Sequence, residues 1–213
     1  MKLRRAIDQD VPGMLALKKQ LAFQVQDGQS TRGGFLLGTT AQGYREKLRD
    51  GLVWILEDTQ LEGFAIVLPD ASFKQSEVWQ SRHAVSGDVP IDAFEAMSLG
   101  YFDQLAVRPG ASRRYSAALA LTAMVDLMQT GVDAMITATV VEPVVNLAAV
   151  PLVKRMGGVC IGRLDEHTPE VGDLVSDIWV VARDGYERWM TTAQGPGASW
   201  IQHLAKEATA QHL

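Results

Sequence analysis

The sequence predicts one α/β (α+β) domain built on a mixed, mostly antiparallel twisted sheet, with a parallel strand–helix–strand unit at its centre. Two strand-length apolar runs, 52–57 and 63–68, are separated by a short turn, which favours an antiparallel hairpin. A strand pattern at 100–107 is followed by a helical pattern and by a further strand at 133–141. Two parallel neighbouring strands need such a helical crossover, and the crossover is almost always right-handed.

The remaining elements extend this central unit on both sides. We expect further strands at 2–7, from 159–162 onward and at 177–183, and further helices at 11–26, 41–49, 146–156, 186–192 and 199–212. The connection 69–89 has weak periodicity and predicts a long excursion with little local structure. The domain is therefore expected to span 1–183, with a C-terminal helical extension over 184–213.

Cap and turn residues support these boundaries. Asp8 suits an N-cap, and Pro12 falls in the first turn of the helix that follows. Gly157 and Gly158 suit the end of the 146–156 helix, which Pro151 weakens at about its second turn. A polar turn is expected at 165–172.

Composition narrows the functional classes. The chain has 213 residues, of which 47% are hydrophobic, and a net charge of -5. This charge argues against nucleic-acid binding, so an anionic ligand would need a local basic patch. No apolar run reaches the roughly 20 residues of a membrane span, and the N-terminus lacks the apolar region of a signal peptide. We therefore expect a cytoplasmic protein with no nucleic-acid and no membrane partner.

Cysteine and histidine suggest neither a disulfide nor a metal site. Cys160 is the single cysteine, and its apolar neighbours predict a buried thiol. The four histidines have no zinc-type spacing with it. No metal is expected.

The turn after the central strand has the chemistry of an anion site. Arg113 and Arg114 precede three small residues, Ser116, Ala117 and Ala118. The first N–H groups of a helix lack internal partners, and small side chains let an anion approach them. The two arginines add charge and forked donors. The pattern predicts a diphosphate cradle, with a plain strand–turn–helix joint as the alternative.

Two motifs lie within this central unit and directly after it. The first is a strand–turn–helix motif made by Leu105, Val107, Pro109, Arg113, Ser116 and Ala118. The second is an Asn-x-x-Ala motif ending in glycine, made by Asn146, Ala149, Lys154 and the pair Gly157 and Gly158. With the order of elements over about residues 2–183, these motifs make the chain resemble the GNAT superfamily of acyl-CoA-dependent N-acyltransferases.

The resemblance implies a co-substrate, acetyl-CoA or another acyl-CoA, and an acceptor amine on a protein or small molecule. It implies that the pantetheine arm pairs with main-chain groups of Leu105, Ala106 and Val107. It implies that the pyrophosphate is held by main-chain groups of Arg113, Arg114, Tyr115, Ser116, Ala117 and Ala118. Asn146 would lie near the ligand where two parallel strands splay apart, and an N–H near Val107 would stabilise the oxyanion.

Three departures from the family pattern leave two functions open. Ser116 replaces a glycine, and one extra residue lies between Pro109 and Arg113. Val153 occupies the position where many members carry a tyrosine that acts as an acid. The first function is an N-acyltransferase, and the alternative is an acyl-CoA-binding or protein-interaction module that acylates nothing.

Acyl transfer also needs a group that accepts the proton of the amine, usually a carboxylate. Asp103 shares strand alternation with Leu105 and Val107, so we predict that it faces the same side as the thioester. Glu142, at the end of the next strand, is the second catalytic candidate. A structural hydrogen bond for Asp103 and a charge at a helix start for Glu142 are the alternatives. The tail helix either packs on the domain or forms a homodimer contact.

Overall fold

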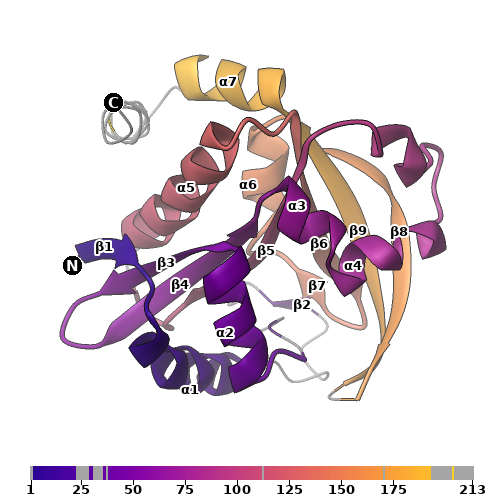
Figure 1. Ribbon diagram of the computed structural model, residues 1–213. Coiled ribbons are helices and arrows are strands. Elements are labelled where there is room, and N and C mark those ends of the chain that lie inside the picture. The colour runs from indigo at the N-terminus through magenta and orange to yellow at the C-terminus, as the bar shows by residue number, and fades with distance from the viewer. Residues whose placement is uncertain are drawn as a thin grey trace.

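The computed structural model describes residues 2–22, 29–30, 36, 38–111, 113–169, 171–192 and 203 (Figure 1). The strands are β1 (Lys2–Arg5), β2 (Gln29–Ser30), β3 (Leu52–Glu57), β4 (Leu61–Leu68), β5 (Leu99–Val107), β6 (Ala134–Glu142), β7 (Val145–Asn146), β8 (Val159–Thr168) and β9 (Gly172–Ala182). The helices are α1 (Val11–Leu21), α2 (Ala41–Asp50), α3 (Asp70–Lys74), α4 (Glu77–Gln80), α5 (Arg113–Gln129), α6 (Val150–Arg155) and α7 (Arg183–Thr192).

Within these ranges, seven strands form one twisted sheet in the order β1-β3-β4-β5-β6-β9-β8. β5 and β6 are parallel neighbours, and the other neighbouring pairs of this sheet are antiparallel. The predicted hairpin of β3 and β4 and the predicted β5–α5–β6 crossover are both confirmed. β2 and β7 form a separate, short parallel pair.

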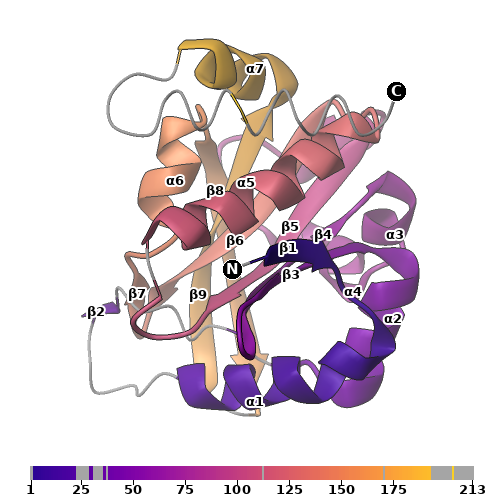
Figure 2. The ribbon, with the colours of Figure 1, turned by 90° about the vertical axis from the view of Figure 1, so that its left-hand side faces the viewer.

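The sheet divides the hydrophobic core into two. On the face that we call the α2 face, α1, α2, α3 and α4 contribute Met14, Leu17, Tyr44, Phe73 and Trp79. On the opposite α5 face, α5, α6 and α7 contribute Leu119, Met124, Val153, Tyr186 and Met190. Figure 2 shows α5 running across its face of the sheet, with α1 at the far end of the molecule from α7. Because Tyr186 and Met190 are buried, α7 packs on the domain.

Helix α5 lies close to the strands because two of them carry glycine where it crosses. A Cβ on Gly63 would lie 3.0 Å from the side chain of Leu119, and one on Gly100 would lie 2.7 Å from the side chain of Leu127. The Gly63 Cβ would also lie 2.7 Å from the carbonyl oxygen of Ala106 on the neighbouring strand. A buried carboxylate fixes the helix further. Asp126 accepts a hydrogen bond from Trp54 Nε1 at 2.7 Å and pairs with Arg5 at 2.6 Å.

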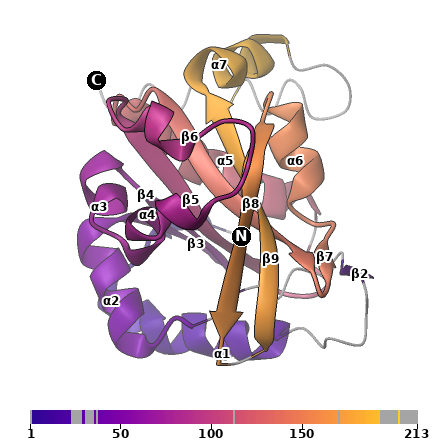
Figure 3. The same cartoon turned by 90° about the vertical axis from the view of Figure 1, so that its right-hand side faces the viewer.

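The connection between β4 and β5 has more structure than the sequence indicated. It holds α3, α4 and two 3-10 turns, Arg82–Ala84 and Ile91–Phe94. Its middle is attached to the edge strand β8, since Ser86 N donates to Arg163 O at 2.8 Å and Arg163 N donates to Ser86 O at 2.7 Å. Figure 3 shows α3 and α4 to the left of the long β8–β9 hairpin. This connection therefore joins the two halves of the α2 face.

Three expectations about the C-terminal half are wrong. The helix expected from residue 146 begins at Val150, because Pro151 lacks an N–H and suits a first turn. The polar turn expected at 165–172 is mostly strand, since β8 runs to Thr168 and β9 starts at Gly172. Cys160, predicted to be buried, is exposed on the edge strand β8 and belongs to neither hydrophobic core. Of the expected tail helix 199–212, all but His203 lies outside the described residues. Among the residues that the structure describes, no helix is long and apolar enough to span a bilayer.

We predict that Gly63→Ala destabilises the protein by about 1–3 kcal/mol, because a rigid carbonyl oxygen blocks the added methyl group and overpacking costs this much. Gly13→Ala in α1 is the control. Its Cβ would meet only the side chain of Leu61, at 3.2 Å, and alanine favours a helix by up to about 1 kcal/mol. Urea denaturation checks both variants, and equal stability of the two would contradict the packing argument.

Candidate functional site

Strand β5 contains a bulge at Asp103. Its register with β4 passes from Ile66 opposite Gln104 to Val67 opposite Phe102, so Asp103 has no partner on β4. The extra residue reverses the alternation of side chains along the strand. Leu105 and Val107 pack on the α5 face, whereas Asp103 pairs with Lys47 of α2. The prediction that Asp103 faces the same side as Leu105 and Val107 is therefore wrong.

The parallel pair parts just beside this bulge. β5 and β6 pair from Leu99 opposite Ala134 to Phe102 opposite Thr137. The Thr137 hydroxyl donates to the Phe102 carbonyl oxygen at 3.0 Å at this last pair. Beyond it, β5 stays paired with β4 and β6 with β9. No strand of the described chain pairs with the β6-facing edge of β5 beyond Phe102, so the expected splay of the parallel strands is present.

Helix α5 begins close to the end of β5 that is not paired with β6, because only five residues separate the helix from this strand. The turn is held by Arg108, whose Nη1 donates to Gln20 Oε1 at 2.7 Å and whose Nη2 donates to Leu61 O at 2.9 Å. Gly110 adopts φ +90°, which glycine tolerates best. Sequence reasoning missed Arg108, which fixes the loop that carries the predicted cradle.

The predicted cradle residues form the first turns of α5. Tyr115 is exposed, Ser116 and Ala117 are half-buried, and Ala118 is buried. The side chains of Arg113 and Arg114 lie outside the described part of the chain, and their backbone is helical. The helix is 17 residues long, so its first N–H groups carry the full partial charge of a helix terminus.

Asn146 lies in β7, where it is opposite Ser30 of β2. Its Oδ1 accepts hydrogen bonds from Ala148 N at 3.1 Å and Ala149 N at 3.3 Å. The side-chain oxygen therefore stabilises the turn before α6. Val153 occupies the position at which many GNAT proteins carry a tyrosine. Its side chain is buried on the α5 face.

Asp103 is neutralised by a cation from α2. Lys47 Nζ lies 2.6 Å from Asp103 Oδ2, and the Asp103 side chain is only 12% exposed. Burial raises the pKa of the Asp103 carboxyl above its ordinary value, and Lys47 acts in the opposite direction. Next to it, Gln104 accepts from Tyr44 Oη at 3.2 Å and donates to Thr39 Oγ1 at 2.9 Å. These contacts fasten the bulge to α2.

A second polar group faces this side from the far strands, and sequence reasoning missed it. Glu166 of β8 accepts a hydrogen bond from the buried Ser176 of β9, with 3.5 Å between the oxygens. Partial burial raises the pKa of the Glu166 carboxyl. The sequence signal for Glu166 is its two-residue spacing from the apolar Leu164 in a strand. The expected polar turn at 165–172 concealed this spacing, because it ended the strand before Glu166.

Tyr101 completes this polar surface on the α2 face. Its ring stacks on Phe73 with centroids 4.9 Å apart and planes 7° apart. Burial, and then the negative charges of Asp103 and Glu166, raise the pKa of the Tyr101 phenol well above its ordinary value. Glu142, the other predicted catalytic carboxylate, is exposed at the end of β6 and has no ion pair with any described residue. The structure does not bring it into contact with Asp103.

No protein-family model and no curated protein matches this sequence. Solved structures do match. A ribosomal-protein-alanine N-acetyltransferase from Brucella melitensis is 15% identical over 85% of this chain and 99% of its own, with a TM-score of 0.54. The chain has the GNAT fold. Naa20 from Chaetomium thermophilum, in complex with a bisubstrate analogue, is 11% identical over 88% of this chain and 90% of its own, with a TM-score of 0.59. FeeM, an N-acyl amino acid synthase from uncultured soil microbes, is 12% identical over 93% of this chain and 97% of its own, with a TM-score of 0.58.

We predict a pH dependence that isolates Asp103. A carboxyl whose pKa is raised on folding binds more protons in the folded than in the unfolded state, so its contribution to stability falls as pH rises from about 4. Relative to Asp103→Asn, the wild type should therefore lose stability from pH 4 upward and level off above its folded pKa. Urea denaturation of both proteins over this range checks the sign. A relative gain would show that Lys47 overcomes the effect of burial.

Proposed function

We propose that this protein is an acyl-CoA-dependent N-acyltransferase, with acetyl-CoA as donor and a primary amine of a protein or small molecule as acceptor. The observation that carries the proposal is the parting of β5 from β6, which leaves one edge of β5 unpaired beyond Phe102 in the described chain. An extended chain of amides can pair with such an edge like an added strand. The pantetheine arm of CoA is a chain of this kind.

The turn after β5 supports the phosphate end of the donor. In our proposal the pantetheine arm lies along Leu105, Ala106 and Val107. The first turn of α5, from Arg113 to Ala118, binds the pyrophosphate through main-chain N–H groups and the helix terminus. In our proposal Asn146, whose side chain stabilises the turn before α6, also borders the donor.

In the proposed reaction, the amine attacks the thioester carbonyl from the α2 face. An N–H of β5 near Val107 would donate to the carbonyl oxygen as negative charge develops there. The bulge favours this, because it separates the polar residues on the α2 face from the apolar Leu105 and Val107 on the α5 face. In this proposal Asp103 borders the reacting groups on the α2 face. It forms an ion pair with Lys47, so the pair carries no net charge.

The comparisons support both acceptor classes. The Brucella structure is of an enzyme named for ribosomal-protein alanine, and FeeM is named as an N-acyl amino acid synthase. We propose the cytoplasm as the compartment, and a homodimer stays a prediction. The alternative function, a CoA-binding module without transfer, is favoured by Val153 at the position of the usual acid.

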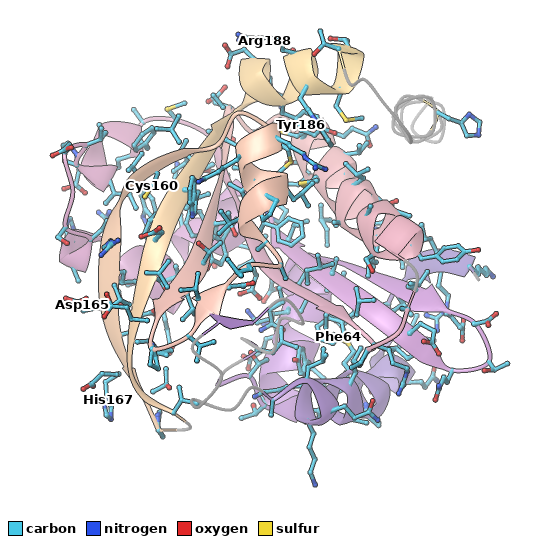
Figure 4. All side chains as sticks on the ribbon, turned by 180° about the vertical axis from the view of Figure 1, so that it is seen from behind. Phe64, Cys160, Asp165, His167, Tyr186 and Arg188 are labelled. Carbon is cyan, nitrogen blue, oxygen red and sulfur yellow. The ribbon has the colours of Figure 1, made fainter. Side chains whose placement is uncertain are left out.

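We predict that CoA binds in the micromolar to millimolar range and that Arg113→Glu weakens it at least about tenfold, since charge-assisted hydrogen bonds contribute about 1.5–3 kcal/mol. Isothermal titration calorimetry measures both. Arg188→Glu is the matched control, because Arg188 is an exposed residue of α7 that pairs with Asp184 (Figure 4). Absence of CoA binding to the wild type would refute the proposed function.

Transfer itself is tested by thiol release from acetyl-CoA. The acceptor panel contains peptides that begin with alanine, free amino acids and n-propylamine. We expect release above the rate of hydrolysis with at least one class. CoA binding without release on any acceptor would instead favour the module.

A further inference from the structure

Arg108 is the first residue of the short turn between β5 and α5. In the proposed function this turn joins the strand edge at Val107, along which the pantetheine arm lies, to the helix start at Arg113, which binds the pyrophosphate. Residues 108–112 alone separate the two elements. In a connection this short, a displacement of the first residue moves the start of the helix. The way in which Arg108 is held therefore affects the position of the predicted cradle.

The side chain of Arg108 connects the turn to two other elements. Its Nη1 donates to Gln20 Oε1 of α1 at 2.7 Å, and its Nη2 donates to the carbonyl oxygen of Leu61 in β4 at 2.9 Å. Its Nε lies 3.4 Å from Glu62 Oε2, also in β4. All three nitrogens of the guanidinium group thus face protein oxygens, and the rigid planar group fixes the directions between them.

The main chain of Arg108 is held at the same place. Arg108 N donates to Glu62 O at 2.7 Å, where the pairing of β4 with β5 ends. The carbonyl oxygen of Arg108 accepts a hydrogen bond from Ala111 N at 3.0 Å, which closes a turn around Gly110. Arg108 is therefore the residue at which the turn is attached to the sheet, through its main chain, and to α1, through its side chain.

The charge of Arg108 is compensated inside the protein. The side chains of Arg108 and Glu62 are 24% and 13% exposed, so their ion pair is partly shielded from water. A phosphate placed at this guanidinium would also approach the Glu62 carboxylate, and like charges repel each other. Arg108 is thus better suited to fixing the turn than to binding an anion directly.

We propose that Arg108 is a positioning residue for the acyl donor. It holds the turn so that the open edge of β5 and the first N–H groups of α5 bind the two ends of one CoA molecule, and it does not touch that molecule itself. This inference rests on the proposed function, since it requires CoA to span these two elements. Ordering a long side chain costs conformational entropy, and here the side chain is ordered by the protein before the ligand arrives. A site that is ordered in advance binds its ligand more tightly.

Arg4 offers a matched control at another place in the fold. Its side chain is also 24% exposed, and its three nitrogens also bond to neighbouring elements. Nε donates to Glu57 Oε2 at 2.8 Å, and Nη1 and Nη2 donate to the Asp10 carboxylate at 2.7 and 2.8 Å. Arg4 lies in β1, which β3 and β4 separate from β5. Replacing either arginine therefore removes a comparable set of contacts, but only one of the two sets includes the turn before α5 in the described chain.

The first test measures CoA binding to the wild type, Arg108→Gln and Arg4→Gln by isothermal titration calorimetry. We expect Arg108→Gln to raise the Kd at least about tenfold and Arg4→Gln to leave it unchanged, since small misplacements of binding groups are costly. Loss of folded protein lowers the fitted number of sites, whereas a misplaced turn raises the Kd, so the same titration separates the two. Equal Kd values in all three proteins, or an equal rise in both variants, would overturn the assignment.

Two further variants separate positioning from direct binding of the phosphates. Arg108→Lys keeps the charge but loses the fork that reaches Gln20 and Leu61 together, so we expect its Kd to stay raised. Gln20→Ala removes the exposed partner on α1 and leaves Arg108 in place, so its Kd should rise by about twofold to tenfold, the usual effect of one hydrogen bond. Wild-type affinity in both variants would show that Arg108 acts through its charge and would contradict positioning.

The outcome for the wild type distinguishes this inference from the proposed function. If the wild type binds CoA and Arg108→Gln binds it equally well, the inference fails and the proposed function stands. If the wild type does not bind CoA, the proposed function fails first. With an active acceptor, thiol release adds a second measurement: Arg108→Gln should raise the KM for acetyl-CoA and leave the KM for the amine unchanged. A rise in the KM for the amine alone would contradict a role in donor binding.

Discussion

The end of pairing between β5 and β6 at Phe102 and Thr137 is the constraint on which the rest of the site depends. Each strand keeps its other neighbour beyond this point, so the two diverge without either losing its place in the sheet. The divergence leaves one edge of β5 with unpaired main-chain groups. Buried main-chain groups need partners, so this edge favours a ligand that can supply them.

The bulge at Asp103 gives the two faces of the opening different characters. Before it, Tyr101 faces the α2 side, and after it Gln104 does so, which places Leu105 and Val107 against α5. The α5 face is apolar and tightly packed, since Gly63 and Gly100 let the helix approach the strands. The α2 face instead collects hydroxyl, amide and carboxylate groups. A thioester between them would meet apolar packing on one face and proton-handling groups on the other.

Electrostatics on the α2 face distinguishes two carboxylates that look alike in the sequence. Lys47 compensates Asp103, whereas Glu166 receives only the hydroxyl of Ser176. A compensated carboxylate stabilises the fold locally, and an uncompensated one attracts a cation. The connection between β4 and β5 contributes to this surface, because it supplies Phe73 beneath Tyr101 and attaches to β8 at Arg163.

The sequence by itself determined the mixed sheet, the β3–β4 hairpin and the β5–α5–β6 crossover, because run length, turn residues and periodicity are local properties of the chain. It also indicated the start of α5 and the parting of the parallel strands, the latter through a family resemblance. Only the tertiary structure decided which way Asp103 faces, since the bulge is defined by register with β4. It alone placed the Ser176 hydroxyl beside Glu166, because these residues lie on two neighbouring strands whose register the sequence does not show. Alternation can be read from one strand, but register and neutralising partners depend on segments that only folding brings together.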